Sequence, residues 1–505
     1  MQALPPPVRT DSHQIDHATF QELMAEHLRR APWLVLSAAL HAAAVLVLWL
    51  LIPPEAKEKP RNFVEMAAAS QPEAIEPEPV KLPEPMLEQQ PDVVADPQPT
   101  PTEQPNEAFD NTVSDNPAKE SAFNHTDWNS AVGLGGGAGG PYGGRGNGGG
   151  NGKTPRPHHG STEAALEWLK NHQDEDGKWD CDGFGKHDDP ASEPCGGPGN
   201  ATHDVGVTGL ALLAFFGHGS TMRSGAHKDT IKRGVNWLRT QQGPDGLFGQ
   251  PVSHDFIYDH AIAAYAMCEA YGLSGYETLR PYAQKGLNYL EKHRNPYSVW
   301  RYQPRDNDND TSVTGWAIMA YESGQFFKLT VNTEALKLCA QWLDQVSDPS
   351  GRHGYSKQGE PSSRKPGEHG TRFPVEKGEA MTAVGLFCRF FMGQSPKEKP
   401  IMKAAADLLL TKTPAWDEKA GTIDHYYWYY ATYALFQMGG THWTTWQKKL
   451  EAAVVKNQHV DKAKKNLYGS WNPTCAWGED GGRVYSTAIL ALTLQANYRY
   501  SRLVR

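Results

Sequence analysis

The hydrophobic pattern between residues 162 and 492 alternates between two kinds of predicted helix. One kind is amphipathic, with apolar residues three and four positions apart, as in a helix that keeps one face in solvent. The other kind is apolar on most of its faces, as in a helix packed on several sides. An amphipathic segment, a turn with glycine and an aromatic residue, and an apolar segment follow one another six times. This repetition predicts an all-α fold of six helical hairpins.

A fixed set of spacings defines the repeat. The amphipathic helix carries an aromatic residue followed by leucine, and then come a glutamine, a glycine and a second aromatic residue. The first copy consists of Trp168, Leu169, Gln173, Gly177 and Trp179, and the second of Trp237, Leu238, Gln242, Gly246 and Phe248. We interpret the glycine as a left-handed turn position and the glutamine as a partner for free backbone groups. The later copies are incomplete, and the sixth ends at Gly469 and Trp471.

The apolar segments carry small residues along their length, and an acidic residue stands near the start of three of them. These acidic residues are Asp204, Asp259 and Asp310. Small faces permit the close packing that an inner ring of helices needs. Hairpins that close on themselves also hide the end repeats, which an open array has to cap. We therefore expect an (α/α)6 toroid over residues 158–505.

The repeat frame resembles the Gln-Trp motif of the squalene–hopene cyclases and of their relatives, the prenyltransferase β subunits. The resemblance covers the last two-thirds of the chain, and its first two copies match the frame almost completely. It implies the same toroid, with an apolar, isoprenoid-like ligand in a central cavity. True triterpene cyclases usually have two helical barrels, whereas this chain has one.

A nearly unbroken apolar run covers residues 33–52, with Ser37 and His41 as its polar interruptions. Twenty residues match the length of a membrane-spanning helix. A cleaved signal peptide is the alternative, but a head of more than thirty residues precedes the run, and Pro53 follows it in place of a small-residue cleavage site. We therefore predict a short head over residues 1–32 and a transmembrane helix over residues 33–52.

Residues 53–157 are expected to form a disordered linker, first rich in proline and acidic residues and then rich in glycine. Between residues 54 and 130, acidic residues outnumber basic ones by 16 to 5, so the segment cannot build a core and repels itself. Because the whole chain has a net charge of −9, the acidity belongs to the linker and the toroid is close to neutral. Such a toroid lacks the basic footprint of a nucleic-acid-binding protein.

The linker resembles the arms of anchored proteins that reach away from a membrane. We therefore predict a single-pass membrane protein with the toroid on the extracytoplasmic, periplasmic side, although the basic residues flanking the apolar run are nearly balanced. Cys181 and Cys195 lie in one loop of the first repeat and are a candidate disulfide, with two free thiols as the alternative.

The cyclase resemblance directs attention to the start of the third apolar segment. Cyclases of this type begin an inner helix with Asp-x-Asp-Asp-Thr, whose middle aspartate protonates an alkene. Here the family's acid falls on Asn309, and an amide cannot donate that proton, so Asp308 and Asp306 are the substitutes if the loop is shifted. Asp310 is the third catalytic candidate, and its alternative role is to cap the helix.

The prenyltransferase resemblance implies a zinc ion held by Asp, Cys and His at inner-helix starts. His260 and His425 stand at such starts, but no Asp-x-Cys pair opens an inner helix. We therefore predict no metal and no cofactor.

Aromatic residues on consecutive positions of the fifth apolar segment cannot all face one packed side. Some are expected to line an apolar pocket inside the ring, where cyclases use aromatic rings to steady cations. Core packing between the rings is the alternative. The predicted pocket residues are Trp316, Tyr265, His260, Asp259, Asp204, His425, Tyr429 and Tyr433.

Three functions remain open from the sequence. We favour binding of an isoprenoid-like or lipid ligand in the central cavity, with catalysis in doubt because the acid motif is altered. An active terpene cyclase-like enzyme and a scaffold protein of the cell envelope are the alternatives.

Overall fold

The computed structural model of the protein describes residues 40–41, 43 and 158–500. In these residues all of the regular secondary-structure elements are helices. Residues 158–500 belong to one compact unit of the chain. The prediction of an all-α fold is therefore confirmed for the described part of the chain.

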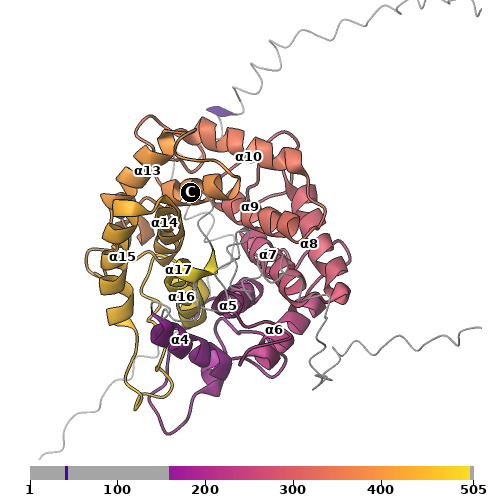
Figure 1. The fold of residues 1–505 in the computed structure, drawn as a ribbon, viewed down its shortest axis with the longest axis vertical. Coiled ribbons are helices and arrows are strands. Elements are labelled where there is room, and N and C mark those ends of the chain that lie inside the picture. The colour runs from indigo at the N-terminus through magenta and orange to yellow at the C-terminus, as the bar shows by residue number, and fades with distance from the viewer. Residues whose placement is uncertain (1–39, 42, 44–157, 501–505) are drawn as a thin grey trace, which may run out of the picture. The chain divides into compact units, whose positions relative to one another are not determined.

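Six apolar helices form an inner ring in which each helix packs against the next (Figure 1). The last of them also packs against the first, so the ring is closed. In chain order they are α5 (Asp204–His218), α7 (Phe256–Ser274), α9 (Thr311–Phe326), α12 (Ala380–Phe391), α14 (His425–Met438) and α16 (Gly478–Leu494).

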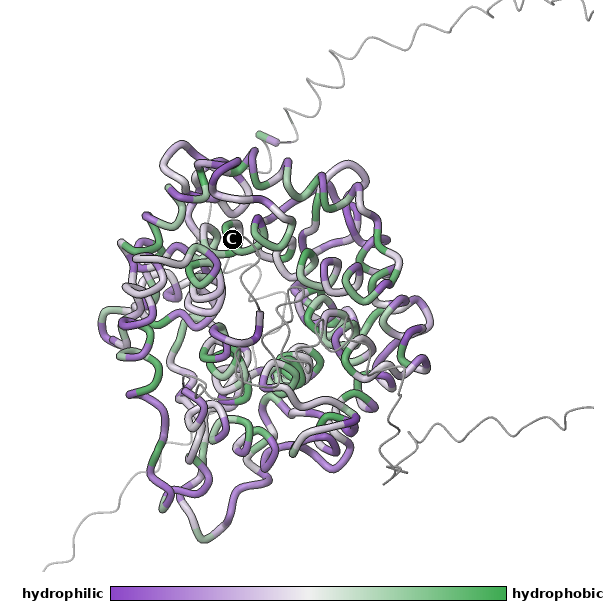
Figure 2. Tube along the Cα trace, in the orientation of Figure 1, coloured by the Kyte–Doolittle hydropathy of each residue, from purple (hydrophilic) through white to green (hydrophobic). Residues whose placement is uncertain are grey.

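Six amphipathic helices surround this ring, and each joins an inner helix in a hairpin. Hydrophobic positions concentrate on the inner helices, while hydrophilic positions face outward (Figure 2). The outer helices are α4 (His159–Asn171), α6 (Lys228–Thr240), α8 (Arg280–His293), α10 (Thr333–Val346), α13 (Ile401–Leu410) and α15 (Gly440–Val454), and two short helices, α11 (His369–Arg372) and α17 (Ala496–Arg499), complete the set.

The repeat frame performs the structural role that its residue types predict. Gln173 Nε2 donates to the carbonyl of Gly177 at 2.8 Å and to the carbonyl of Thr230, on the next outer helix, at 3.0 Å. Gly177 has a φ of +103°, and a Cβ there would lie 2.3 Å from the carbonyl oxygen of Arg233. The frame thus binds the first hairpin to the second.

The same contacts close the ring between the last repeat and the first. Gln458 Nε2 donates to the carbonyls of Gly469 and Ser161, both at 2.8 Å. Gly469 has a φ of +94°, and a Cβ there would lie 2.1 Å from the carbonyl oxygen of Ala164 in α4. Since α16 also packs on α4 and α5, the sixth hairpin meets the first as closure predicts.

The C-terminal segment fills part of the ring's interior. Helix α17 contacts α5, α14 and α16, and lies inside the ring in Figure 1. Arg499 is fully buried there and forms an ion pair of 3.0 Å with Glu269 on α7. Tyr500 packs edge-on against Phe391 and Tyr433. One end of the interior is therefore closed by the protein's own chain.

The prediction of a single-pass membrane localisation is contradicted. Among the described residues, no helix combines the length and the apolar character that a bilayer crossing requires. Of the predicted span, residues 33–52, only Leu40, His41 and Ala43 are described, far fewer than the roughly 20 residues of a spanning helix. The predicted head and linker lie outside the described residues.

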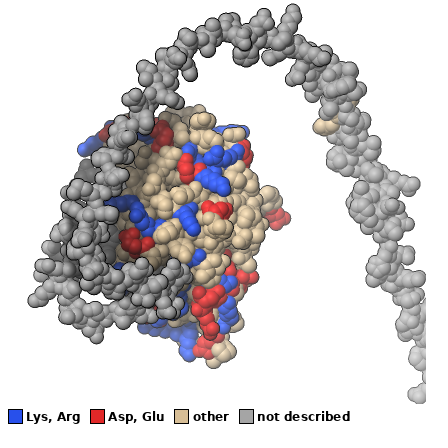
Figure 3. All heavy atoms as spheres, turned by 90° about the vertical axis from the view of Figure 1, so that its right-hand side faces the viewer, with Lys and Arg blue, Asp and Glu red and all other residues tan. Residues whose placement is uncertain are grey.

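Two further features concern the thiols and the surface. Cys181 and Cys195 are both buried free thiols, so the candidate disulfide is not formed and the alternative holds. On the visible face of the described residues, Lys and Arg are interleaved with Asp and Glu (Figure 3).

Candidate functional site

The amino ends of the inner helices each carry an acidic residue with a cationic partner. Such acids are favoured there by the free backbone N–H groups and the helix dipole. The pairs are Asp204 with Lys178 at 2.6 Å, Asp259 with His203 at 3.1 Å, Asp310 with Arg301 at 3.8 Å, Glu379 with Arg352 at 2.6 Å, Asp424 with Arg364 at 3.2 Å, and Asp480 with Lys365. Five of these pairs are close ion pairs, and the Asp310 pair is the longest.

Asp310 is the N-cap of α9 and has no exposed surface. Its Oδ1 accepts a hydrogen bond from the backbone N–H of Val313 at 2.7 Å, which confirms the capping role. Its Oδ2 accepts from Tyr355 Oη at 3.4 Å and lies 3.8 Å from Arg301 Nε. Burial raises the pKa of Asp310 to about 7, against the opposing effects of the Val313 N–H and Arg301. At neutral pH this carboxyl is therefore able to give or take a proton.

Four tyrosines from four different elements gather around Asp310, and we call them the tyrosine cage. They are Tyr258 on α7, Tyr302 before α9, Tyr355 after α10 and Tyr426 on α14. Tyr302 Oη and Tyr355 Oη are 2.6 Å apart, and Tyr426 Oη is 2.8 Å from Ser312 Oγ. Burial raises the pKa of each of these tyrosines, and the charge of Asp310 adds to the effect.

The other two catalytic candidates lie outside the cage. Asp306 and Asp308 are exposed, and Asp306 Oδ1 accepts from the backbone N–H of Asp308 at 2.9 Å. Asn309, at the position of the family's acid, holds the loop together, because its Oδ1 accepts from Val299 N and from Asn295 Nδ2 at 3.1 Å. Of the three predicted acids, the structure thus brings only Asp310 into an enclosed site.

The predicted aromatic pocket residues do meet inside the ring, where they pack on one another. The rings of Trp316 and Tyr429 stack with centroids 5.8 Å apart and planes 12° apart. Tyr433 lies edge-on to Tyr429, and Tyr265 Oη is hydrogen-bonded to Tyr500 Oη. We call Trp316, Tyr429 and Tyr433 the aromatic wall, and their rings are in mutual contact.

The two predicted histidines belong to the framework. His260 Nδ1 accepts from the backbone N–H of Phe248 at 3.0 Å, which is the role of Thr208, Thr314 and Thr382 in other repeats. His425 is buried against the rings of Trp416 and Trp428.

Asp204 and Asp259 line a separate cleft of about 260 Å³ between the first two hairpins. Both carboxylates are already engaged by Lys178 and His203. The apolar lining includes Val205, Trp237, Phe248 and Phe256. This cleft is too small for a triterpene, since ligand pockets for drug-sized molecules start at about 300 Å³.

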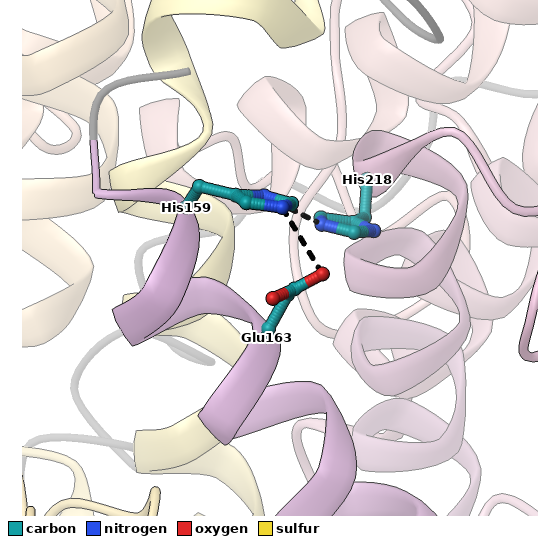
Figure 4. A group of neighbouring side chains, drawn as sticks. All are labelled: His159, Glu163 and His218. Atoms are coloured by element: carbon teal, nitrogen blue, oxygen red, sulfur yellow. Dashed lines mark hydrogen bonds and ion pairs between the residues drawn. The ribbon is translucent and has the colours of Figure 1, made fainter. Parts of the chain in front are cut away.

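One group of metal-capable side chains lies on the surface (Figure 4). His159 and Glu163 come from α4, and His218 comes from the end of α5. His159 uses both of its ring nitrogens, one toward Glu163 at 3.0 Å and the other toward His218 at 3.4 Å. Both ring nitrogens of His159 therefore already have a protein partner.

Sequence reasoning missed the tyrosine cage and Arg301. Tyr302 and Tyr355 each stand two residues after the last frame position, which is occupied by Trp300 in the third repeat and His353 in the fourth. The recurrence of tyrosine at this position is the signal that was available. Tyr258 has no comparable signature.

No protein-family model and no curated protein matches the chain. Solved structures that align with it include an α-1,6-mannanase of Salegentibacter, a type II terpene cyclase from Scytonema, and cellobiose 2-epimerase from Bacillus thermoamylovorans. Their identities are 9%, 12% and 14%, they cover 67%, 67% and 66% of this chain and 98%, 96% and 96% of their own, and their TM-scores are 0.46, 0.41 and 0.39. At these values the alignments assign neither a reaction nor a substrate to this chain.

Proposed function

We propose that the protein is an acid–base enzyme in which Asp310 donates a proton to an electron-rich, mainly apolar ligand such as an unsaturated isoprenoid. The observation that carries the proposal is the fully buried carboxyl of Asp310 in the tyrosine cage, with its pKa raised to about 7. Tuned carboxylic acids of this kind serve as general acids near neutral pH.

The hydrogen bonds around Asp310 supply a route for its proton. The Tyr302 and Tyr355 hydroxyls are 2.6 Å apart, and Tyr355 Oη reaches Asp310 Oδ2 at 3.4 Å. Tyr302 is only half-buried, so this chain leads from solvent to the buried carboxyl. After each turnover the chain returns a proton to Asp310. Arg301 and the Val313 N–H stabilise the carboxylate in the meantime.

The aromatic wall suits the charge that such a reaction creates. Transfer of the proton from Asp310 Oδ2 to one carbon of a double bond leaves a cation on the other carbon. The π faces of Trp316 and Tyr429 attract cations when the two stacked rings move apart to admit a ligand. Loss of a proton from the cation to water then re-forms a double bond, while the tyrosine chain returns a proton to Asp310, so the net reaction is an isomerisation or cyclisation. The step needs no redox partner and no metal to balance.

Entry of a ligand requires movement of the cage. Asp310 is fully covered in this structure, while Tyr258 and Tyr302 are half-buried and form the outer part of the cage. The proposal therefore requires these two side chains to be displaced when a ligand enters.

Binding without turnover is the second candidate function. It is favoured by the gathering of the aromatic side chains Trp316, Tyr429 and Tyr433 inside the ring, which offers an apolar surface. A ligand held by the aromatic wall then stays chemically unchanged.

An isotope experiment separates the two functions. The full-length protein is incubated in D2O with squalene or geranylgeraniol, and the extracted lipids are analysed by mass spectrometry. Proton donation predicts isomeric products that carry deuterium, and their loss in Asp310→Asn. Retention of unlabelled, unchanged lipid by the wild type supports binding alone and contradicts catalysis. If neither lipid is retained or converted, the isoprenoid assignment is wrong.

A further inference from the structure

We propose that His172, Asp188 and Cys195 form a zinc site that fastens the loop between α4 and α5 at the seam of the ring. The metal-binding atoms of the three side chains all lie within 4.8 Å of one another. Imidazole, carboxylate and thiolate are the usual protein ligands of zinc. The three side chains lie in or next to the loop between α4 and α5, and the only inner helix that starts close to them in the sequence is α5. They are separate from the tyrosine cage.

The distance between the nitrogen ligand of His172 and the oxygen ligand of Asp188 fits a zinc site. His172 Nε2 and Asp188 Oδ1 are 3.3 Å apart. Two ligands bound tetrahedrally at about 2.0–2.1 Å from a zinc ion are about 3.3–3.4 Å apart, since they span one edge of the tetrahedron. The separation fits two atoms that share a metal, and it also fits the hydrogen bond that the two side chains can form with each other.

The tautomer of His172 is fixed by its second ring nitrogen. His172 Nδ1 lies 2.8 Å from the carbonyl oxygen of Trp168, which can only accept, so Nδ1 carries the hydrogen. His172 Nε2 faces Asp188 Oδ1 at 3.3 Å, so either a proton or a metal ion joins the two atoms.

The surroundings orient all three ligands. The bond from His172 Nδ1–H to a backbone carbonyl is the outer-shell contact typical of metal-bound histidines. Asp188 Oδ2 accepts from the backbone N–H of Cys195 at 2.9 Å, which turns Oδ1 toward His172. The Trp168 ring stacks on the imidazole at 4.1 Å, and Phe184 lies edge-on to it at 6.2 Å, so both rings hold the imidazole in place.

Cys195 binds zinc as a thiolate, so the thiol proton is released when the metal binds. With three protein ligands, the fourth tetrahedral position is open to water.

The position of the loop indicates what the metal does. Asn466, in the last repeat, accepts from Asp189 N at 2.8 Å and donates to Asp189 O at 3.1 Å. Arg483 of α16 donates to the carbonyl of Gly196 at 2.9 Å. The loop thus bridges the first and last repeats on both sides of Cys195, and zinc there locks the closed ring.

The test measures metal on the full-length protein after removal of any polyhistidine tag. We expect one zinc per chain by elemental analysis, and a thiolate-to-metal charge-transfer band when cobalt(II) replaces zinc. Cys195→Ala should abolish the band and weaken zinc binding by at least about 100-fold. Cys268→Ala is the matched control, because Cys268 is also buried but lies on α7.

Two results would overturn the site. One is a wild-type protein that takes up no zinc and shows no rise in melting temperature when zinc is added. The other is zinc binding that Cys195→Ala leaves unchanged. If Cys195→Ala does not fold, Asp188→Asn, which keeps the shape of the side chain, is judged by the same criteria.

Discussion

Gln458 Nε2 lies 2.8 Å from the carbonyl oxygen of Ser161, and this hydrogen bond joins the sixth repeat to the first. Its counterpart, from Gln173 to Thr230, joins the first repeat to the second. Ring closure therefore uses the same contact as the junction between the first two repeats.

Replacement of Gln458 should destabilise the whole ring. Gln458→Ala leaves the carbonyls of Ser161 and Gly469 without their side-chain donor in a buried junction, which typically costs about 1–3 kcal/mol of unfolding free energy. Gln447→Ala is the control, because that half-buried amide donates to Glu451 on its own helix. Denaturant unfolding that ranks the two variants equally would contradict closure by this contact.

The left-handed glycines predict a contrast between two substitutions of the same kind. Gly177→Ala places a Cβ 2.3 Å from the carbonyl oxygen of Arg233 at a φ of +103°, so we expect a lower melting temperature. Gly160→Ala, in α4, meets no atom within 4 Å and should raise stability by about 0.5–1 kcal/mol. Thermal melts of both variants check the sign of each effect.

The pKa of Asp310 predicts how stability depends on pH. Its folded value of about 7 lies above the unfolded value of about 3.9, so the folded protein holds the extra proton between them. The contribution of Asp310 is largest below pH 4, falls by at most about 1.4 kcal/mol per pH unit, and levels off above pH 7. Asp310→Asn, which can still cap α9, should remove this slope. Parallel stability profiles of the two proteins from pH 4 to 8 would contradict it.

The cage hydroxyl nearest to Asp310 should act on its proton affinity. Tyr355 Oη donates to Asp310 Oδ2 and so favours the charged carboxylate. Tyr355→Phe should therefore raise the pKa of Asp310 further and move the pH midpoint of stability upward. Tyr297→Phe, at a ring that is 92% exposed, should change nothing. The measurement is the pH midpoint in each variant, and a downward shift in Tyr355→Phe would refute the assignment.

The fold was predictable because its signal is local and repeated. Gln173 and Gly177 show their roles through spacing alone, since each acts on a neighbouring hairpin at a fixed offset. The sixth copy retains enough of the frame at Gly469 to predict closure. Capping by Asp310 was also predictable, because a helix start needs an acceptor for its free N–H groups.

The site was less predictable because its residues are far apart in the chain. The tyrosine cage unites Tyr258, Tyr302, Tyr355 and Tyr426, which come from different hairpins and meet only in the folded ring. Sequence spacing likewise gave no sign that Asn309 secures a loop, or that His260 replaces a threonine of the frame.

The protonation state of Asp310 tests the central claim most directly. Full-length protein labelled with 13C at the aspartate carboxyls is titrated by NMR, and the Asp310 signal is assigned by its absence in Asp310→Asn. Burial in the tyrosine cage predicts a titration midpoint near pH 7. A midpoint at or below about 4, the ordinary value for aspartate, would show that Asp310 is an ionised helix cap at neutral pH. It would contradict the role of Asp310 as a buried general acid.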